Sequence, residues 1–172
     1  FLIFTMSVSI LFQTSLISSY VSGWDIQYEY YLAELVMNNS YWFSNFNYVV
    51  NSMLSVTILA PILSIIPKIG LNWTLKVTYP ILFSLVPLGL YDIFKKQTNS
   101  KIAFLSSFIF ISFFAYYLEM ISLARQEIGE IFLILLVMVM ISDELDYMRR
   151  SIFFIVFGAS LVVSHYGLAY FY

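Results

Sequence analysis

Several ionisable residues of this chain lie within or beside long apolar runs, namely Asp25, Glu29, Arg125, Glu130 and His165. Asp25 and Glu29 are spaced i,i+4, so a helix would place both carboxylates on one face. A carboxylate can accept a proton from a hydroxyl group, and an arginine can hold a phosphate through two parallel hydrogen bonds. An ionisable side chain inside a membrane span costs several kcal/mol unless it is paired or hydrated. These residues are therefore candidates for a functional site.

The candidate residues in the later part of the chain are predicted to lie at one depth in the membrane. At about 1.5 Å per helical residue, Arg125 lies about 27 Å, and Glu130 about 20 Å, above Asp143. By the same measure His165 lies about 22 Å above Arg150. All three fall in the outer third of the bilayer, and the two carboxylates of the first loop join them if that loop is external.

The composition identifies the class of protein. Of the 172 residues 61% are hydrophobic and 10% are charged, with a mean hydropathy of +0.87, whereas soluble domains carry about 25% charged residues. The net charge of −2 excludes a basic surface for nucleic acid. The absence of cysteine and the single histidine exclude thiolate catalysis and multi-histidine metal sites. The sequence therefore predicts an integral membrane protein, with the lipid bilayer as its surroundings.

The apolar runs predict an all-α, polytopic transmembrane helix bundle with about five spans. The whole chain, 1–172, reads as a single transmembrane domain and as a fragment of a longer protein, whose carboxy-terminal remainder would be a partner. The predicted spans are residues 1–24, 69–91, 102–121, 123–142 and 151–172. A cleaved signal peptide is a less favoured alternative for residues 1–22, since no basic segment precedes them.

Residues 24–68 are predicted to form an external loop with interfacial, juxtamembrane helices. The run 53–67 contains Pro61 and Pro67 and reaches about 22 Å as a helix, short of the roughly 30 Å of a bilayer core. We therefore expect it to dip into the interface. If it crosses instead, the preceding loop becomes cytoplasmic.

The basic residues set the orientation of the spans. Five of them fall in the two loops that follow residues 91 and 142: Lys95, Lys96, Lys101, Arg149 and Arg150. Basic loops face the cytoplasm, so the turn that contains Arg125 is predicted to be external.

Each candidate residue also has a purely structural explanation. Asp25 could cap the helix that it begins, and Arg125 could form an ion pair with Glu127 or Glu130 at a helix turn. His165 could make an interhelical hydrogen bond. The aromatic residues beside Asp25 could belong to the aromatic belt of the membrane interface.

Five stretches carry a resemblance to a known family. They are GWDIQYEYYLAELV after the first span, SVTILAP, YPILFSLVPLGLYDIFKKQ, LARQEIGEIFLILLVMVM and VSHYGLAYFY. Together they resemble the uncharacterised archaeal multi-pass membrane proteins related to the GT-C glycosyltransferases, over nearly the whole chain. In that superfamily an acidic residue of the first external loop serves the reaction, and juxtamembrane helices follow it. The resemblance implies that Asp25 is this acid, that 53–67 is juxtamembrane and that the first loop is external.

The resemblance also implies roles for the other candidates. The second external turn, ARQEIGE, corresponds to the place where such enzymes hold the lipid-phosphate donor, which assigns substrate binding to Arg125, Gln126 and Glu130, with His165 in the same layer. Trp24 and Tyr28 would stack on sugar rings. Glu29 could replace Asp25 as the base, since it lies one turn away. Because Asp25 is followed by Ile26, the DE or DxD motif is absent, so a divalent metal is possible as a cofactor but has no support from such a motif.

The predicted function is the transfer of a sugar from a polyprenyl-phosphate-linked donor to an acceptor on the external side of the cell membrane. Direct attack of the acceptor on the anomeric carbon would invert its configuration. The alternative is a multi-pass transporter or flippase for a lipid-linked or small polar substrate, which would use the buried charges as an ion pathway.

Overall fold

A computed structural model describes residues 1–45 and 49–171, and helix makes up 77% of the chain. No β-strand occurs in the described ranges. The α-helices are α1 Leu2–Ser15, α2 Asp25–Asn39, α3 Leu54–Thr57, α4 Leu59–Ile65, α5 Leu71–Trp73, α6 Tyr79–Phe83, α7 Val86–Gln97, α8 Ser100–Ser112, α9 Ala124–Met140 and α10 Tyr147–Ser164. The predicted all-α class is confirmed.

Among the described residues, two helices are long and apolar enough to cross a membrane. One is the continuous helix Leu71–Gln97, which contains α5, α6 and α7, and the other is α10. A third span exists if α8 and Ala115–Ser122 are taken together, although the two segments meet at an angle of 53°. The described part of the chain thus has two or three helices with the length and composition of membrane spans.

The first and last predicted spans end earlier than the sequence suggests. Helix α1 ends at Ser15, not at Trp24, and its 14 residues reach only about 21 Å. The chain after it is held by side chains of α5 and the π-helical turn Thr74–Thr78: Asn72 accepts a hydrogen bond from the Val21 amide at 3.0 Å, and the Lys76 ammonium donates to the Ser18 carbonyl. These contacts replace the helical hydrogen bonds that the prediction assumed.

Helix α10 likewise ends at Ser164, and His165 is extended. The following residues form a single 3-10 turn, Leu168–Phe171. The predicted span 151–172 is therefore wrong in its last part, where Gly167 interrupts the apolar run.

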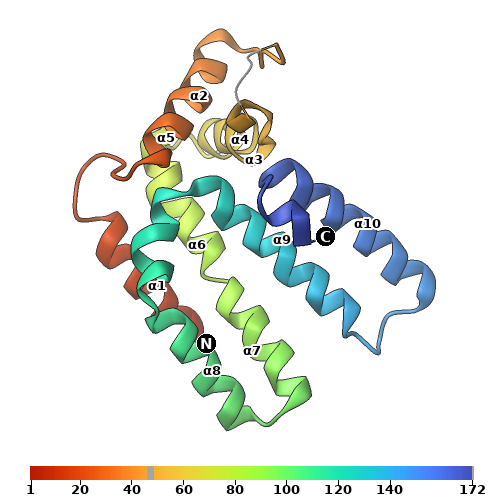
Figure 1. The fold of residues 1–172 in the computed structure, drawn as a ribbon. Helices are drawn as coiled ribbons and strands as arrows, with labels where there is room; N and C mark the ends of the chain where they lie inside the picture. Colours follow the sequence, from red (N-terminus) through yellow and green to blue (C-terminus); the bar gives the residue numbers. More distant parts are fainter. Residues whose placement is uncertain (46–48, 172) are drawn as a thin grey trace.

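The loop helices form one end of the molecule (Figure 1). Helices α2, α3, α4 and α5 gather there, while the α7–α8 and α9–α10 loops lie at the opposite end. The predicted juxtamembrane segment 53–67 consists of the two short helices α3 and α4. The basic loops and the carboxylate-bearing helix α2 thus lie at opposite ends.

A buried apolar cluster joins α2 to the start of α9. Its members come from the loop helices, from α5 and α6, and from the first turns of α9: Ile26, Ala33, Val56, Ala60, Leu71, Leu75, Tyr79, Ala124 and Ile128. Fully burying a large aliphatic side chain stabilises a water-soluble core by about 1.5–3 kcal/mol. In this cluster the same close packing fixes the position of α2 against α9 and brings their polar residues together.

Candidate functional site

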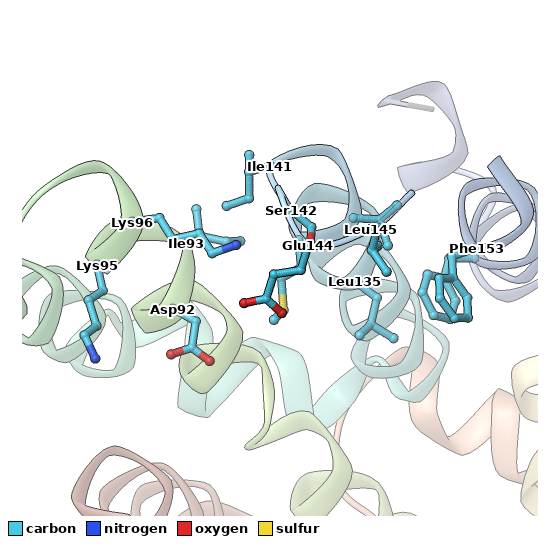
Figure 2. Close-up of a pocket in the computed structure, with 13 residues that line it drawn as sticks. Asp92, Ile93, Lys95, Lys96, Leu135, Ile141, Ser142, Glu144, Leu145 and Phe153 are labelled. Carbon is cyan, nitrogen blue, oxygen red and sulfur yellow. The ribbon is translucent and has the colours of Figure 1, made fainter. Parts of the chain in front are cut away.

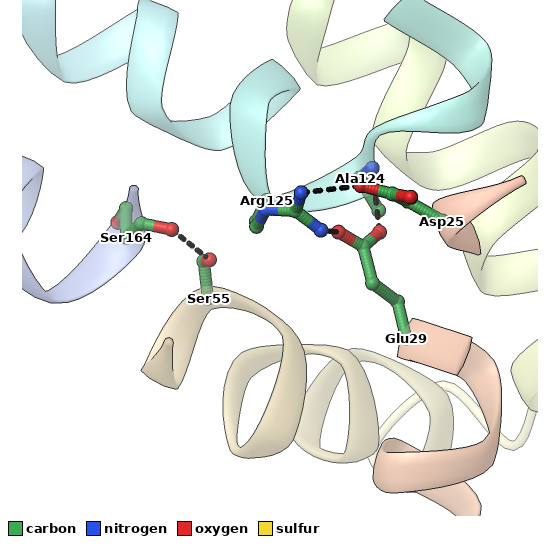
Figure 3. Close-up of polar contacts among 6 residues, drawn as sticks. All are labelled: Asp25, Glu29, Ser55, Ala124, Arg125 and Ser164. Carbon is green, nitrogen blue, oxygen red and sulfur yellow. Dashed lines mark hydrogen bonds and ion pairs between the residues drawn. The ribbon is translucent and has the colours of Figure 1, made fainter. Parts of the chain in front are cut away.

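Arg125, in the first turn of α9, lies between two carboxylates of α2 (Figure 3). Its Nη2 atom donates to Asp25 Oδ2 at 2.5 Å, and its Nη1 atom donates to Glu29 Oε1. The backbone N–H of Ala124 donates to the other oxygen of Glu29 at 2.8 Å. We refer to Asp25, Glu29 and Arg125 as the ionic cluster. Helix α2 and helix α9 are thus joined by charge-assisted hydrogen bonds, which are stronger than neutral ones.

The sequence brings the cluster together through helix geometry and one glycine. Asp25 and Glu29 lie on the same face of α2 because they are spaced i,i+4, and Ile26 beside them is buried. Just before α2, Gly23 has φ +140°, and a Cβ atom there would lie 2.3 Å from Ser122 Oγ. Glycine alone adopts this conformation without strain, so Gly23 allows the start of α2 to approach the turn before α9.

Burial distinguishes the two carboxylates. The Glu29 side chain is 0% exposed, whereas the Asp25 side chain is 48% exposed. Burial raises the pKa of Glu29 from its ordinary value of 4.5 to about 7, although the charge of Arg125 and the Ala124 amide both oppose this change. A carboxyl with a pKa near 7 exchanges its proton near neutral pH, but only Asp25 is open to a substrate.

The position of Arg125 changes the role that the sequence suggests for it. Its side chain is only 6% exposed, and both terminal nitrogens are paired with carboxylates. As it stands, Arg125 orients Asp25 and Glu29 and has no terminal nitrogen open to a phosphate. Its guanidinium also lies 5.9 Å from the ring centroid of Tyr166, a cation–π contact with the segment that follows α10.

The structure brings the remaining polar candidates of α9 and His165 close to the ionic cluster. Gln126 donates to Glu130 at 3.0 Å along α9. His165 stacks on Tyr166, and its Nδ1 accepts the Leu168 N–H at 3.0 Å, which places the proton of the neutral ring on Nε2. A Cβ atom on Gly129 would lie 2.9 Å from the Cβ of His165, so the two helix ends are in direct contact.

The aromatic candidates lie on the outer part of α2. Trp24 is 94% exposed, and Tyr28 is half-buried and stacks on Tyr31 at 6.5 Å. The exposed ring of Trp24 is available for contact with a sugar or with lipid, whereas Tyr28 presents only part of its side chain. The sequence alternatives of sugar stacking and an aromatic belt therefore both stay open for these two residues.

Two further elements of the site were not among the sequence candidates for function. Glu127 is 1% exposed, and within the described part of the chain its Oε1 has no hydrogen-bond partner. Ser55 of α3 donates to the carbonyl of Ser164 at 2.9 Å, which ties the loop helices to the end of α10 (Figure 3). For Glu127, the sequence offered the signal of an acidic residue just before the apolar run that begins at Ile131. The contact between Ser55 and Ser164 has no comparable signal in the sequence.

The described residues contain no group of three or more His, Asp or Glu side chains that could hold a metal ion. The acidic groups of the site instead share one arginine.

Comparison with known proteins gave no match: no family model, no curated protein and no solved structure matches this chain.

Proposed function

We propose that this protein is an integral membrane glycosyltransferase of the GT-C kind, which transfers a sugar from a polyprenyl-phosphate-linked donor on the external side of the membrane. The observation that supports this proposal is the ionic cluster. It holds one half-exposed carboxylate, Asp25, against a buried arginine at the end of the protein opposite the basic loops. Such an arrangement provides a general base and a cation, the two groups that sugar transfer from a lipid phosphate requires.

In the proposed reaction Asp25 accepts the proton of the acceptor hydroxyl. The acceptor oxygen forms a bond to the anomeric carbon while the bond from that carbon to the phosphate oxygen breaks, and the polyprenyl phosphate leaves with the electron pair. Protonation of Asp25 neutralises one of the two carboxylates that pair with Arg125. One terminal nitrogen of Arg125 then becomes available to the leaving phosphate, which an arginine binds well.

Glu29 is a positioning residue in this proposal. It has no exposed surface, and it holds both Arg125 and the first amide of α9. Its replacement by glutamine should disturb the pairing of Arg125 and thereby the orientation of Asp25. We therefore expect an effect on the pH dependence of the reaction as well as on its rate.

The experiment measures transfer of radiolabelled sugar from polyprenyl-phosphate sugars by the full-length protein in proteoliposomes. Asp25→Asn should lower kcat about 10²- to 10⁴-fold, the usual effect of removing a general base. Glu29→Gln should retain more activity and should shift the pH profile. Asp143→Asn, in the exposed loop at the opposite end, is the matched control and should be unchanged. Equal activity in Asp25→Asn and Asp143→Asn would overturn the proposal.

A transporter or flippase is the second candidate, and Glu127 is the observation that favours it. A buried acid with an oxygen that has no hydrogen-bond partner in the described residues is typical of proton and ion pathways. In proteoliposomes with an imposed pH gradient, a transporter would lose coupled uptake in Glu127→Gln. A glycosyltransferase would show no such uptake with either form of residue 127.

A further inference from the structure

A cavity of about 620 Å³ lies at the opposite end of the molecule from the ionic cluster, among α7, α9, α10 and the loop between the last two (Figure 2). Its volume falls within the range of roughly 300–1,000 Å³ that is usual for ligand pockets. The end of α7 and the loop that follows Met140 line it, which places it at the end of the molecule predicted to face the cytoplasm. None of the proposed catalytic residues lines it.

The walls of this cavity are mostly apolar. Figure 2 shows Leu135, Leu145 and Phe153 on one side, with the charged groups of Asp92 and Lys96 on the other and Glu144 between them. Helix α10, which provides Phe153, also carries exposed apolar side chains outside the cavity, such as Ile152 and Ile155. An acyl chain could therefore lie against the apolar wall of the cavity, beside the exposed apolar side chains of α10.

The charged groups of the cavity determine which head group fits. The ammonium of Lys95 lies over the ring of Tyr91, 5.8 Å from its centroid. The other charged residues of the lining are Lys96, Asp92 and Glu144, and none of these three forms an ion pair with another described residue. With Lys95 and Lys96 as cations and Asp92 and Glu144 as carboxylates, the lining carries charges of both signs and no net charge. A phosphate alone would meet two repelling carboxylates, whereas a phosphate that carries an ammonium group would find a partner for each charge.

We propose that this cavity binds one phospholipid with an amine-bearing, zwitterionic head group, independently of the proposed transferase reaction. The phosphate pairs with Lys96, the ammonium group pairs with Asp92 and Glu144, and the upper part of one acyl chain lies along Leu135 and Phe153. The cavity lies beside the ends of two helices with the length and composition of membrane spans, Leu71–Gln97 and α10. This position favours a lipid over a water-soluble ligand, because head groups and the first carbons of the acyl chains lie at the ends of such spans.

The test is native mass spectrometry of the purified full-length protein. The protein is incubated with an equimolar mixture of phosphatidylethanolamine and phosphatidylglycerol of identical acyl chains. We expect ethanolamine lipid to be retained about fivefold more than glycerol lipid, as one weak, partly exposed charge pair allows. Glu144→Gln should remove most of this preference, and Asp143→Asn, a neighbour outside the cavity, should leave it unchanged.

Two further variants separate the head group from the acyl chain. Lys96→Gln should weaken retention of both lipids, in contrast to Lys101→Gln, which lies outside the cavity. Leu135→Trp should fill the apolar part and reduce retention of both lipids, with the thermal unfolding temperature showing that the protein is folded. Equal or stronger retention of the glycerol lipid, or the same behaviour of Glu144→Gln and Asp143→Asn, would overturn the proposal.

Discussion

The buried Glu29 predicts an unusual dependence of stability on pH. The pKa of its carboxyl is raised by burial from 4.5 to about 7 in the folded protein. The folded state therefore keeps a proton that the unfolded chain releases between these two values. Stability from this group is fully present below about pH 4.5 and is lost as the pH rises through 7. Removing the acid by Glu29→Gln should abolish this loss, since glutamine has the charge and shape of the protonated acid.

The magnitude follows from the size of the pKa change. At about 1.4 kcal/mol per pKa unit, the difference between the two values for Glu29 corresponds to about 3 kcal/mol by pH 7.5. The side chain has no exposed surface, so solvent does not screen the effect. For a chain of this length the equivalent change in Tm is on the order of 10 °C at most.

The assay is thermal unfolding of the purified protein in detergent from pH 4 to pH 8. The quantity of interest is the Tm of the wild type minus that of Glu29→Gln, because this difference cancels the titration of all other groups. We expect it to be constant below pH 4.5 and to fall steadily up to pH 7.5, while Asp143→Asn follows the wild type. A difference that stays constant, or that rises with pH, would refute the reasoning, because it would mean that Glu29 is ionised by Arg125 throughout this range.

Three further predictions concern the same end of the molecule and its orientation. Replacing Arg125 with Met should lower the free energy of unfolding by about 3–5 kcal/mol, because it leaves two carboxylates of α2 without their cation. Arg125→Lys should have a smaller effect. If chemical denaturation gave both variants the same free energy of unfolding, the ion pairs would not contribute to stability. Gly23→Ala should destabilise the protein by about 2 kcal/mol or more, since a Cβ atom would strain the backbone and clash with Ser122, and an unchanged Tm would contradict the close approach of α2. Single cysteines at the exposed Asn39 and Gln97, in a chain that has no other cysteine, should react with an impermeant maleimide from opposite sides of sealed vesicles. Labelling of both from one side would make the segment 53–67 a true span and would contradict the predicted topology.

The sequence predicted the members of the ionic cluster from two quantities, the spacing of residues along a helix and their position along a predicted span. The i,i+4 spacing of Asp25 and Glu29 predicted a shared helix face, and the depth of Arg125 predicted that it would lie in the same layer; the structure places all three in direct contact. The short, proline-containing segment 53–67 was predicted to differ from a span, and it forms two short helices. Both predictions used quantities that a sequence contains, namely spacing and length.

Other features depended on contacts between distant segments. Helix α1 ends at Ser15 because Asn72 and Lys76, far away in the chain, hold the residues that follow it. The helix after α8 bends by 53° where Phe113 is extended, although neither proline nor glycine marks the position. The local periodicity of the sequence predicts neither the early end of α1 nor the bend after α8.

The sequence also could not predict which charged side chains of the site are buried and which are exposed. Arg125 was expected to be open to a phosphate, but packing against α2 leaves it 6% exposed. Spacing alone could not decide which of the two carboxylates of α2 would be accessible, since one helical turn separates them. The tertiary packing of α2 decides this, and it exposes Asp25 while enclosing Glu29.

The most direct test of the central claim is the product formed by the purified full-length protein from a polyprenyl-phosphate sugar and a hydroxyl acceptor, with its anomeric configuration determined by NMR. A single base at Asp25 predicts a product of inverted configuration, formed by the wild type and reduced about 10²- to 10⁴-fold in Asp25→Asn. A product of retained configuration, or equal amounts of product from the wild type and Asp25→Asn, would contradict the assignment of Asp25 as the base.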